Sequence, residues 1–395
     1  MRILHVTPYF APAFRYGGPP RSILGLCRAL QRAGVEVEVF TTTANGDTAL
    51  PASPVGGDRY EGVPVWYFPW TFPRRLFGVR GLGEALESEL GKCDVLHIQG
   101  LWTLPGWIAA LRARRAGVPY VISPRGMLDP WSMAHRPVRK RIAYWMADRW
   151  NLRGAAFLHA TSTAEATAIR NWTRGVPIVT LPNGVDVPET RAQGEFRRRL
   201  NVSADAPLLV SLGRLHMKKR LDLLAAAFER ILPLHPLAHL VIAGPDEGDY
   251  RRKVKSHFAA VTSRVHWTGE LQDAEKWALL ADATALVMCS DSENFGLAVL
   301  EALAAGVPVV VVQTCPWEEV HTARCGFWVP QSAEAIADAL LVLLRDPEGA
   351  LAMGERGRTL ARAKYSWDAI ARAMADRYEA VVDARSGRGS RPHEP

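Results

Sequence analysis

The chain has 395 residues, enough for two domains of ordinary size, each with its own hydrophobic core. Apolar residues make up 48% and charged residues 22%, which is the composition of a globular protein and not of a disordered or fibrous one. The formal net charge of +8 favours anionic partners, among them nucleotides, nucleic acids and acidic membrane surfaces, without choosing among them.

Cysteine usage and hydropathy favour a cytoplasmic protein. The five cysteines are scattered and include no C-x-x-C pair, so neither a disulfide framework nor a structural zinc site is expected. We expect no signal peptide, because residues 1–10 read directly as a strand, and no transmembrane helix, because no run of about 18 apolar residues occurs. Peripheral contact with the inner face of the cytoplasmic membrane is left open.

The first half of the chain alternates apolar strands with amphipathic helices. Residues 2–10 form a strand, 22–34 a helix and 35–42 the next strand, a succession that predicts a parallel sheet. The pattern continues with a helix at 103–117 and strands at 94–100, 118–126, 155–162 and 177–187.

A second series of the same kind follows a polar connection at 188–207, which is expected to hold a short helix. Its predicted strands are 206–215, 238–247, 265–271, 285–293, 308–314 and 326–330, and its predicted helices are 221–236, 273–281, 297–305 and 332–345. Two helices end the chain, at 347–364 and 366–384, and the second is expected to pack back on the first domain. The polar, basic residues 385–395 are predicted to be disordered. The predicted fold is therefore α/β, with Rossmann-like domains at 1–187 and 206–365.

Two short motifs at predicted strand ends indicate anion binding. Gly17 and Gly18 stand at the start of the first helix, where a backbone without Cβ atoms lets a ligand approach and free N–H groups favour an anion. In the second half, Arg214 and Lys219 follow a strand end, and two cations there suit a diphosphate. A flexible loop and a solvated basic loop are the alternatives. No G-x-G-x-x-G follows the first strand, which argues against a dinucleotide dehydrogenase.

The string SDSENFGLAVLEALAAGVPVV, residues 290–310, carries the most specific signal. An apolar strand gives way to Glu293 and to a turn at 294–296, and Leu297 begins a helix that Gly306 ends. The N–H groups near Phe295–Leu297 are unpaired at such a helix start and favour a phosphate group.

The two glutamates of this string suit the ends of a nucleotide sugar. Glu301, about one turn into the helix, can accept hydrogen bonds from ribose hydroxyls. Glu293, before the helix, faces the other way along such a ligand. The alternative makes Glu293 a partner of the helix dipole and Glu301 a surface residue.

These motifs, with PNGVD at 182–186 and YSW at 365–367, resemble the retaining glycosyltransferases of family 4, the group 1 glycosyltransferases with the GT-B fold. The resemblance covers nearly the whole chain, and E-x7-E is its most specific part. It implies an N-terminal acceptor domain and a C-terminal donor domain that face each other across a donor-binding cleft. TCPWEEV, CGFWV and ISPRGMLDPW resemble a bacterial branch that builds surface polysaccharides.

The resemblance implies a role for each matching residue. The catalytic residues are Glu293, which holds hydroxyls of the donor sugar, and Arg214 and Lys219, which stabilise the leaving diphosphate. The residues implied to bind the donor diphosphate, sugar and ribose are Gly17, Gly18, Asn294, Phe295, Gly296, Leu297 and Glu301. The base is placed near Gly269, Glu270 and Leu271.

The reaction implied is a front-face substitution with retention and without a protein nucleophile. Many members carry a histidine after the fifth strand of the first domain; here that position is Arg125, and His97 ends the preceding strand. Both join the candidate catalytic residues, and the group that deprotonates the acceptor is left open, the donor phosphate included. No metal cofactor is expected, because the acidic stretches DSE and DEGD lack histidine ligands.

The implied partners are a nucleotide-diphosphate sugar as donor substrate and a glycan or polyprenyl-diphosphate-linked glycan as acceptor. The basic and aromatic stretch 136–146 either contacts an anionic membrane or forms a solvated helix face. The competing functions are a nucleotide-sugar epimerase or hydrolase of GT-B fold and an inactive nucleotide-sugar-binding protein. Nucleic acid is not an expected partner, because the basic residues are dispersed and no recognition motif occurs.

Overall fold

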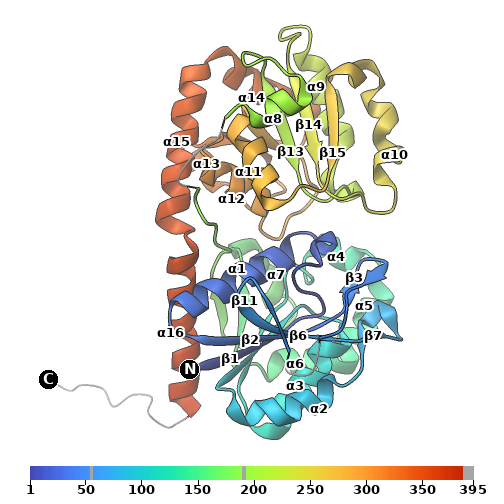
Figure 1. The fold of residues 1–395 in the computed structure, drawn as a ribbon, viewed down its shortest axis with the longest axis vertical. Helices are drawn as coiled ribbons and strands as arrows, with labels where there is room; N and C mark the ends of the chain where they lie inside the picture. The colour runs from blue at the N-terminus through green and yellow to red at the C-terminus, as the bar shows by residue number, and fades with distance from the viewer. Residues whose placement is uncertain (54–56, 189–192, 386–395) are drawn as a thin grey trace, which may run out of the picture. The chain divides into compact units, whose positions relative to one another are not determined.

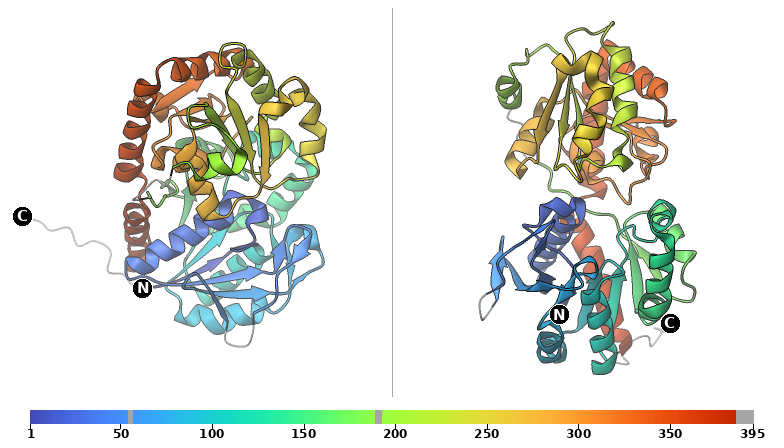
Figure 2. Two further views of the ribbon diagram at one scale, coloured as in Figure 1. Left: turned by 45° about the horizontal axis from the view of Figure 1, so that its top comes forward. Right: turned by 90° about the vertical axis from the view of Figure 1, so that its right-hand side faces the viewer.

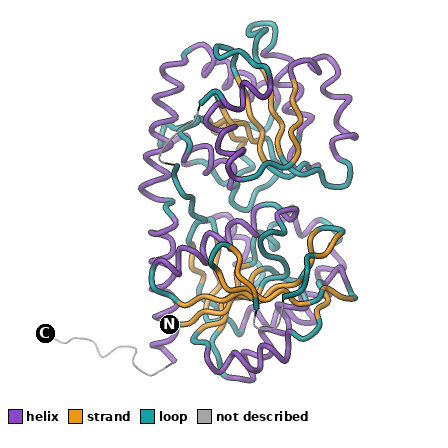
Figure 3. The backbone as a smooth tube through the Cα atoms, in the orientation of Figure 1, coloured by secondary structure: helices purple, strands orange, loops and turns teal. Residues whose placement is uncertain are grey.

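The computed structural model describes residues 1–53, 57–188 and 193–385. They form two compact units (Figure 1). Unit 1 is Met1–Gly184 together with the C-terminal segment that begins at Trp367, and unit 2 is Val185–Ser366. The strands fall into two main groups, one for each unit (Figure 3).

Unit 1 is built on an eight-stranded sheet with the order β12-β11-β10-β9-β1-β2-β6-β5. All neighbours run parallel except β5 and β6, so the expected parallel sheet is confirmed. The strands are β1 (Arg2–Val6), β2 (Glu36–Thr42), β5 (Asp58–Tyr60), β6 (Val63–Phe68), β9 (Val95–Gln99), β10 (Tyr120–Ser123), β11 (Phe157–Ala160) and β12 (Ile178–Thr180). Two-stranded ribbons join β3 (Ala44–Asn45) to β4 (Thr48–Ala49) and β7 (Trp70–Thr71) to β8 (Gly78–Val79).

Helices cover both faces of this sheet. The longer ones are α1 (Gly18–Arg32), α2 (Leu82–Glu89), α3 (Leu104–Ala116), α7 (Thr163–Arg170) and α16 (Trp367–Arg385). The short ones are η1 (Phe14–Tyr16), η2 (Arg74–Leu76), η3 (Leu90–Lys92), α4 (Pro130–Ala134), α5 (Pro137–Ala143), η4 (Tyr144–Asp148) and α6 (Arg149–Arg153). Successive strand residues such as Val95 and Leu96 enter two separate cores, because side chains alternate across a sheet.

The C-terminal helix α16 completes one of these cores. It lies beside α1 (Figure 1) and contributes Trp367, Ile370, Met374 and Tyr378 to the buried cluster. Of the tail predicted to be disordered, Arg385 ends α16, and residues 386–395 lie outside the described residues.

Unit 2 has a six-stranded, fully parallel sheet with the order β15-β14-β13-β16-β17-β18. Its strands are β13 (Leu208–Leu212), β14 (His239–Ala243), β15 (Val265–Gly269), β16 (Ala285–Met288), β17 (Val309–Val312) and β18 (Gly326–Val329). Helices lie on both sides of it (Figure 2). They are α8 (Glu195–Leu200), η5 (Met217–Lys219), α9 (Leu221–Ile231), α10 (Tyr250–Val254), η6 (Lys255–Arg264), α11 (Asp273–Asp282), α12 (Leu297–Ala304), α13 (Glu319–Thr322), α14 (Ala333–Arg345) and α15 (Pro347–Lys364).

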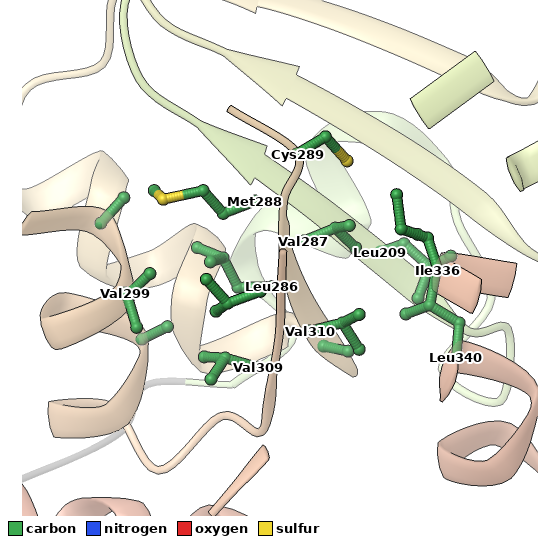
Figure 4. Packing of buried hydrophobic residues seen from close by; sticks show 14 of the residues in the cluster. Leu209, Leu286, Val287, Met288, Cys289, Val299, Val309, Val310, Ile336 and Leu340 are labelled. Carbon is green, nitrogen blue, oxygen red and sulfur yellow. The ribbon is translucent and has the colours of Figure 1, made fainter. Parts of the chain in front are cut away.

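The central strand β16 shows how this sheet is buried on both faces. Leu286 and Met288 point toward Val299 of α12, whereas Val287 points to the opposite side, where Ile336 and Leu340 of α14 lie (Figure 4). Strands covered on both faces read as continuous apolar runs, which is why ALVM and VVVV are recognisable in the sequence.

The predicted interdomain connection at 188–207 needs correction. Its helix α8 is packed into unit 2, where the side chain of Asp282 accepts hydrogen bonds from Gly194 N and Arg197 N, and Phe196 is buried against α11. Polar composition concealed this, because the segment buries one aromatic ring and caps its helix through a distant carboxylate. Unit 2 therefore begins at Val185.

Each sheet reverses its strand order at one point. In unit 2 the order turns back between β13 and β16, and in unit 1 between β1 and β9. Ligands of open parallel sheets bind beyond the carboxyl ends of the strands at such points. None of the described helices is long and apolar enough to cross a membrane.

Packing of α16 on α1 gives a test of the fold. A Cβ added to Gly25 of α1 would lie 2.4 Å from Trp367 Cε2, far inside contact distance. We expect Gly25→Ala to lower the unfolding free energy by about 1–3 kcal/mol, measured by urea unfolding, although alanine favours helix. Gly91→Ala is the control, since nothing lies within 4 Å of its added Cβ. A stabilised Gly25→Ala variant would contradict this packing.

Candidate functional site

The strand-order reversal of unit 2 holds an ion pair. Lys219 ends η5, which follows β13, and Glu293 follows β16; Lys219 Nζ lies 2.7 Å from Glu293 Oε1. Gly213, directly after β13, has φ +141°, and an added Cβ would lie 3.2 Å from Lys219 Nζ. The glycine therefore lets the lysine side chain cross the strand end and reach the carboxylate.

Glu293 is ionised despite being largely enclosed. Burial pushes the pKa of its carboxyl upward, but the ammonium groups of Lys219 and Lys218 outweigh burial, so the pKa lies below its usual value. The side chain of Glu293 is 15% exposed and that of Lys219 is 22% exposed, so solvent reaches both groups.

Arg214 is oriented differently from Lys219. Its Nη1 lies 2.9 Å from Glu247 Oε2, and both side chains are exposed. An exposed ion pair contributes little free energy, so Glu247 holds the guanidinium only weakly.

The turn before α12 is fixed by aromatic packing. Gly296 is the N-cap of α12, with φ 86° and no side-chain cap, and an added Cβ would lie 3.0 Å from Trp317 Nε1. The indole of Trp317 donates to Phe295 O, and the rings of Phe295, Trp317 and Tyr365 form one cluster. Asn294 is partly buried beside this turn. The uncapped first turn at Leu297 suits an anion.

Glu301 is held by a lysine that the sequence analysis did not single out. Lys276 of α11 is buried, and its Nζ lies 2.7 Å from Glu301 Oε1 and 3.1 Å from Asp273 Oδ1. This contact fixes the direction of the Glu301 carboxylate. No local pattern indicates it, because the two residues belong to different helices 25 positions apart.

The strand-end segment at Gly269, Glu270 and Leu271 offers backbone groups. Gly269 O accepts from Gly244 N at 2.7 Å, and its φ is 74°. Leu271 is buried in the core of unit 2 and Glu270 is exposed.

In unit 1, two glycines begin α1. Gly17 is the N-cap with φ 84°, Gly18 is the first helical residue, and no side chain caps this end. The geometry agrees with the expected helix start. Gly17 N already donates to Phe14 O, and Pro19 and Pro20 have no N–H group, so among residues 17–20 only Gly18 N remains for a ligand.

Arg125 lies at the carboxyl edge of the unit 1 sheet, two residues beyond β10. Its Nε donates to Gln99 Oε1 at 2.8 Å and its Nη1 to Asn183 Oδ1 at 3.0 Å. Its backbone is left-handed, with φ 56°.

His97 belongs to a buried chain of hydrogen bonds with one assignable proton order. His159 Nε2 lies 2.9 Å from Leu181 O, which can only accept, so this nitrogen carries the proton. His159 Nδ1 then accepts from the Ser123 hydroxyl at 2.8 Å, Ser123 accepts from His97 Nε2 at 2.7 Å, and His97 Nδ1 accepts from Tyr378 OH at 2.6 Å. This order holds for neutral rings, and burial keeps both histidines neutral because it lowers the pKa of each well below 6.5.

The surroundings of His97 do not suit the catalytic role that was expected from the sequence. Its side chain is fully buried and both ring nitrogens are bonded to protein groups, so neither is open to an acceptor hydroxyl. We therefore assign His97 to the support of the strand ends. Among residues 1–53, 57–188 and 193–385, no cluster of three histidines, cysteines or carboxylates is arranged to hold a metal ion.

Comparison with known proteins gives the family. A model described as "Glycosyl transferases group 1" matches residues 192–360, and one described as "Glycosyl transferase 4-like domain" matches residues 17–184. A GDP-mannose-dependent alpha-(1-6)-phosphatidylinositol monomannoside mannosyltransferase of Mycobacterium tuberculosis is 31% identical over 324 residues, covering 74% of this chain and 79% of the relative. The chain belongs to the group 1 glycosyltransferases.

Other relatives agree with this membership. A GDP-mannose:cellobiosyl-diphosphopolyprenol alpha-mannosyltransferase of Komagataeibacter xylinus is 24% identical over 407 residues, covering 97% of this chain and 94% of that protein. A sucrose-phosphate synthase structure from Thermosynechococcus elongatus superposes with a TM-score of 0.76 at 21% identity, covering 97% and 100% of the two chains. The protein is thus a glycosyltransferase of family 4 and GT-B type.

The buried histidines of this glycosyltransferase predict its pH dependence. Burial is the main cause that lowers the pKa of His5 and His159 to about 3 and that of His97 well below 6.5. Below pH 6.5 these histidines bind more protons in the unfolded chain than in the folded one. Their contribution to the unfolding free energy is therefore fully present above pH 6.5 and is lost as the pH falls toward 3. Each histidine removes about 1.4 kcal/mol of unfolding free energy per pH unit. Asp148, whose pKa burial raises to about 7, acts oppositely and offsets about one histidine.

The measurement is urea unfolding at pH 7.5, 6.5, 5.5 and 5.0. His5→Gln should make the loss of stability with falling pH shallower, whereas the exposed His257→Gln should leave it unchanged. Equal slopes in the wild type and His5→Gln would contradict the assignment.

Proposed function

We propose that this glycosyltransferase moves a hexose, with retention of configuration, from a nucleotide-diphosphate sugar to a glycan or polyprenyl-diphosphate-linked glycan in surface polysaccharide synthesis. The observation that carries the proposal is the Lys219–Glu293 pair, which lies at the strand-order reversal of unit 2 just before the uncapped start of α12. An ammonium, a carboxylate and free N–H groups match a diphosphate joined to a hydroxylated sugar.

The diphosphate is the group that leaves. Lys219 Nζ and Arg214 supply positive charge as the bond between the anomeric carbon and the phosphate oxygen breaks. The N–H groups of Gly296 and Leu297 add partial positive charge without a conformational change.

In this proposal the two glutamates bind the sugar and the nucleoside of the donor. Glu293 orients sugar hydroxyls and stabilises the positive charge that develops at the anomeric carbon. Glu301, directed by Lys276, accepts from the ribose hydroxyls. The base lies against the backbone at Gly269–Leu271.

The bond changes balance without a protein nucleophile or a metal ion. The acceptor oxygen bonds to the anomeric carbon on the face from which the diphosphate departs. The acceptor proton passes to a phosphate oxygen of that leaving group. Arg125, which belongs to unit 1, takes no proton in this scheme.

The donor and acceptor are proposed from the relatives. Two of the proteins compared above are GDP-mannose-dependent mannosyltransferases by name, so GDP-mannose is the first donor to assay. One of them acts on a diphosphopolyprenol acceptor, which supports a polyprenyl-diphosphate-linked glycan here.

Loss of the ion pair should abolish transfer. We expect Lys219→Ala and Glu293→Gln to lower kcat for transfer from GDP-mannose to a polyprenyl-diphosphate glycan by about 100-fold or more, because each removes charge that acts in the transition state. EDTA should leave the wild-type rate unchanged. Product anomers and free mannose are measured by NMR.

The matched controls are Lys255→Ala and Glu334→Gln, both exposed in unit 2. They should keep wild-type rates, and circular dichroism should show all four variants folded. Substantial transfer by Glu293→Gln would refute the site, and free mannose as the main product would favour a hydrolase.

A basic-apolar surface in unit 1 supports membrane contact. Val138, Ile142, Trp145, Met146 and Trp150 are between 54% and 71% exposed. The first four, with Arg141, line an open cavity of about 540 Å³.

The charges around this surface are positive. Arg136, Arg139, Arg141 and Arg153 are exposed, and Asp148, the one acidic residue of the sequence 136–153, is buried. Apolar side chains rimmed by arginine suit an anionic lipid surface.

We expect the protein to float with vesicles that contain phosphatidylglycerol and much less with pure phosphatidylcholine. The double variant Trp145→Ser, Met146→Ser should lower the vesicle partition coefficient about 100-fold or more, because burial of each side chain in lipid contributes about 1.5–3 kcal/mol. Leu351→Ser, at an exposed apolar residue of unit 2, should have no effect. The membrane part of the proposal would be refuted if binding were the same with both lipids and the same in the double variant as in the wild type.

A further inference from the structure

Two buried nitrogens at the carboxyl edge of the unit 1 sheet have no hydrogen-bond partner among the described residues. They are Arg125 Nη2 and His5 Nε2. Both side chains are linked through Gln99, which accepts from Arg125 Nε at 2.8 Å and lies, through its Nε2, 3.3 Å from His5 Nδ1.

The orientation of Gln99 fixes the proton on His5. The amide oxygen is occupied by the arginine, so the amide nitrogen faces His5 and donates to Nδ1. The neutral ring then carries its proton on Nε2. An N–H group of His5 and an N–H group of Arg125 are therefore both buried and unsatisfied, and each such donor costs about 1–3 kcal/mol.

The charge of Arg125 is also incompletely balanced. Its two bonded partners, Gln99 and Asn183, are neutral amides. Glu165 acts on it only at longer range, because its own oxygens accept from Gly126 N, Thr161 N and Thr161 Oγ at 2.6–2.8 Å. An enclosed cation without a paired anion is costly unless something else neutralises it.

These groups lie at the carboxyl ends of the strands, which is where open parallel sheets bind ligands. Gln99 ends β9, His5 lies in β1, and the strand order of unit 1 reverses between these two strands. Arg125 and Asn183 follow β10 and β12 at the same edge. The unsatisfied donors thus lie beside the position of a ligand.

We propose that Arg125, supported by Gln99 and Asn183, forms an oxyanion-binding site on unit 1 that receives a carboxylate or phosphate group of a substrate. The assignment rests on the proposed function for the identity of the substrate. One source is a carboxylate on the transferred sugar, and the other is a phosphate of the lipid-linked acceptor. A guanidinium matches both, because it presents parallel N–H groups to two oxygens.

The test measures anion binding by the whole protein without any transfer. An excess of GDP, UDP and ADP occupies the diphosphate site of unit 2, and sodium phosphate, glucuronate or glucose is titrated at constant ionic strength by calorimetry. Wild type should bind phosphate or glucuronate and should not bind glucose comparably. A preference for glucuronate assigns the transferred sugar, and a preference for phosphate assigns the acceptor.

Two variants separate binding from a structural role. Arg125→Gln removes the charge, and Asn183→Asp supplies Arg125 with an internal carboxylate while it keeps the oxygen that Nη1 contacts. Both should weaken anion binding at least tenfold, and Asn183→Asp should raise thermal stability without ligand. The exposed Arg170→Gln is the control and should bind as the wild type does.

Two results would overturn the proposal. One is the absence of phosphate and glucuronate binding in the wild type. The other is undiminished binding in Asn183→Asp, which would make Arg125 only a tie between strand ends. Inactivity in transfer assays with Arg125-dependent anion binding would count against the proposed function alone, so the two failures are distinguishable.

Discussion

A single ion pair, Lys219 with Glu293, joins two segments at the carboxyl edge of the unit 2 sheet. Its two members come from segments 74 residues apart, and they meet because β13 and β16 are neighbours where the strand order reverses. The pair needs a glycine at 213 for the lysine to cross the strand end. It also needs a fixed turn at 294–296, which the ring of Trp317 provides. The strand order, the glycine at 213 and the packing of Trp317 thus all help to position the carboxylate of Glu293.

Contacts of a different kind hold the carboxyl edge of the unit 1 sheet. Its strand ends are tied by neutral hydrogen bonds that run from Leu181 O through two histidines to the hydroxyl of Tyr378 on α16. A fully bonded polar chain of this kind fixes one arrangement of the buried side chains. Arg125 lies beside these hydrogen bonds as an enclosed cation, and its hydrogen-bonded partners are neutral amides. Among the described residues, the positive charge at this edge is therefore not paired with a bonded carboxylate.

The sequence predicted those features that depend on residues close together in the chain. Apolar runs such as VVVV mark strands covered on both faces, and the string from Glu293 to Glu301 carries its turn, helix start and carboxylates in one stretch. Lys276 and Trp317 could not be found this way, because their roles come from contacts between separate elements. The polar segment around α8 misled for the same reason, since its anchor is the distant Asp282. The strand β6 was missed although VPVWYF alternates in burial, as a half-covered strand should.

The discontinuity of unit 1 bears on how the chain folds during synthesis. Residues 1–184 emerge from the ribosome first, yet the cluster that contains Ile3, Val37 and Phe157 is closed by Trp367, Met374 and Tyr378 of α16. Unit 2 is one continuous segment and has all its residues before α16 appears. The first unit to begin synthesis is therefore the last to complete its core. A fragment that stops at Gly184 would expose the apolar face that α16 covers, and C-terminal truncation would damage the N-terminal half of the protein.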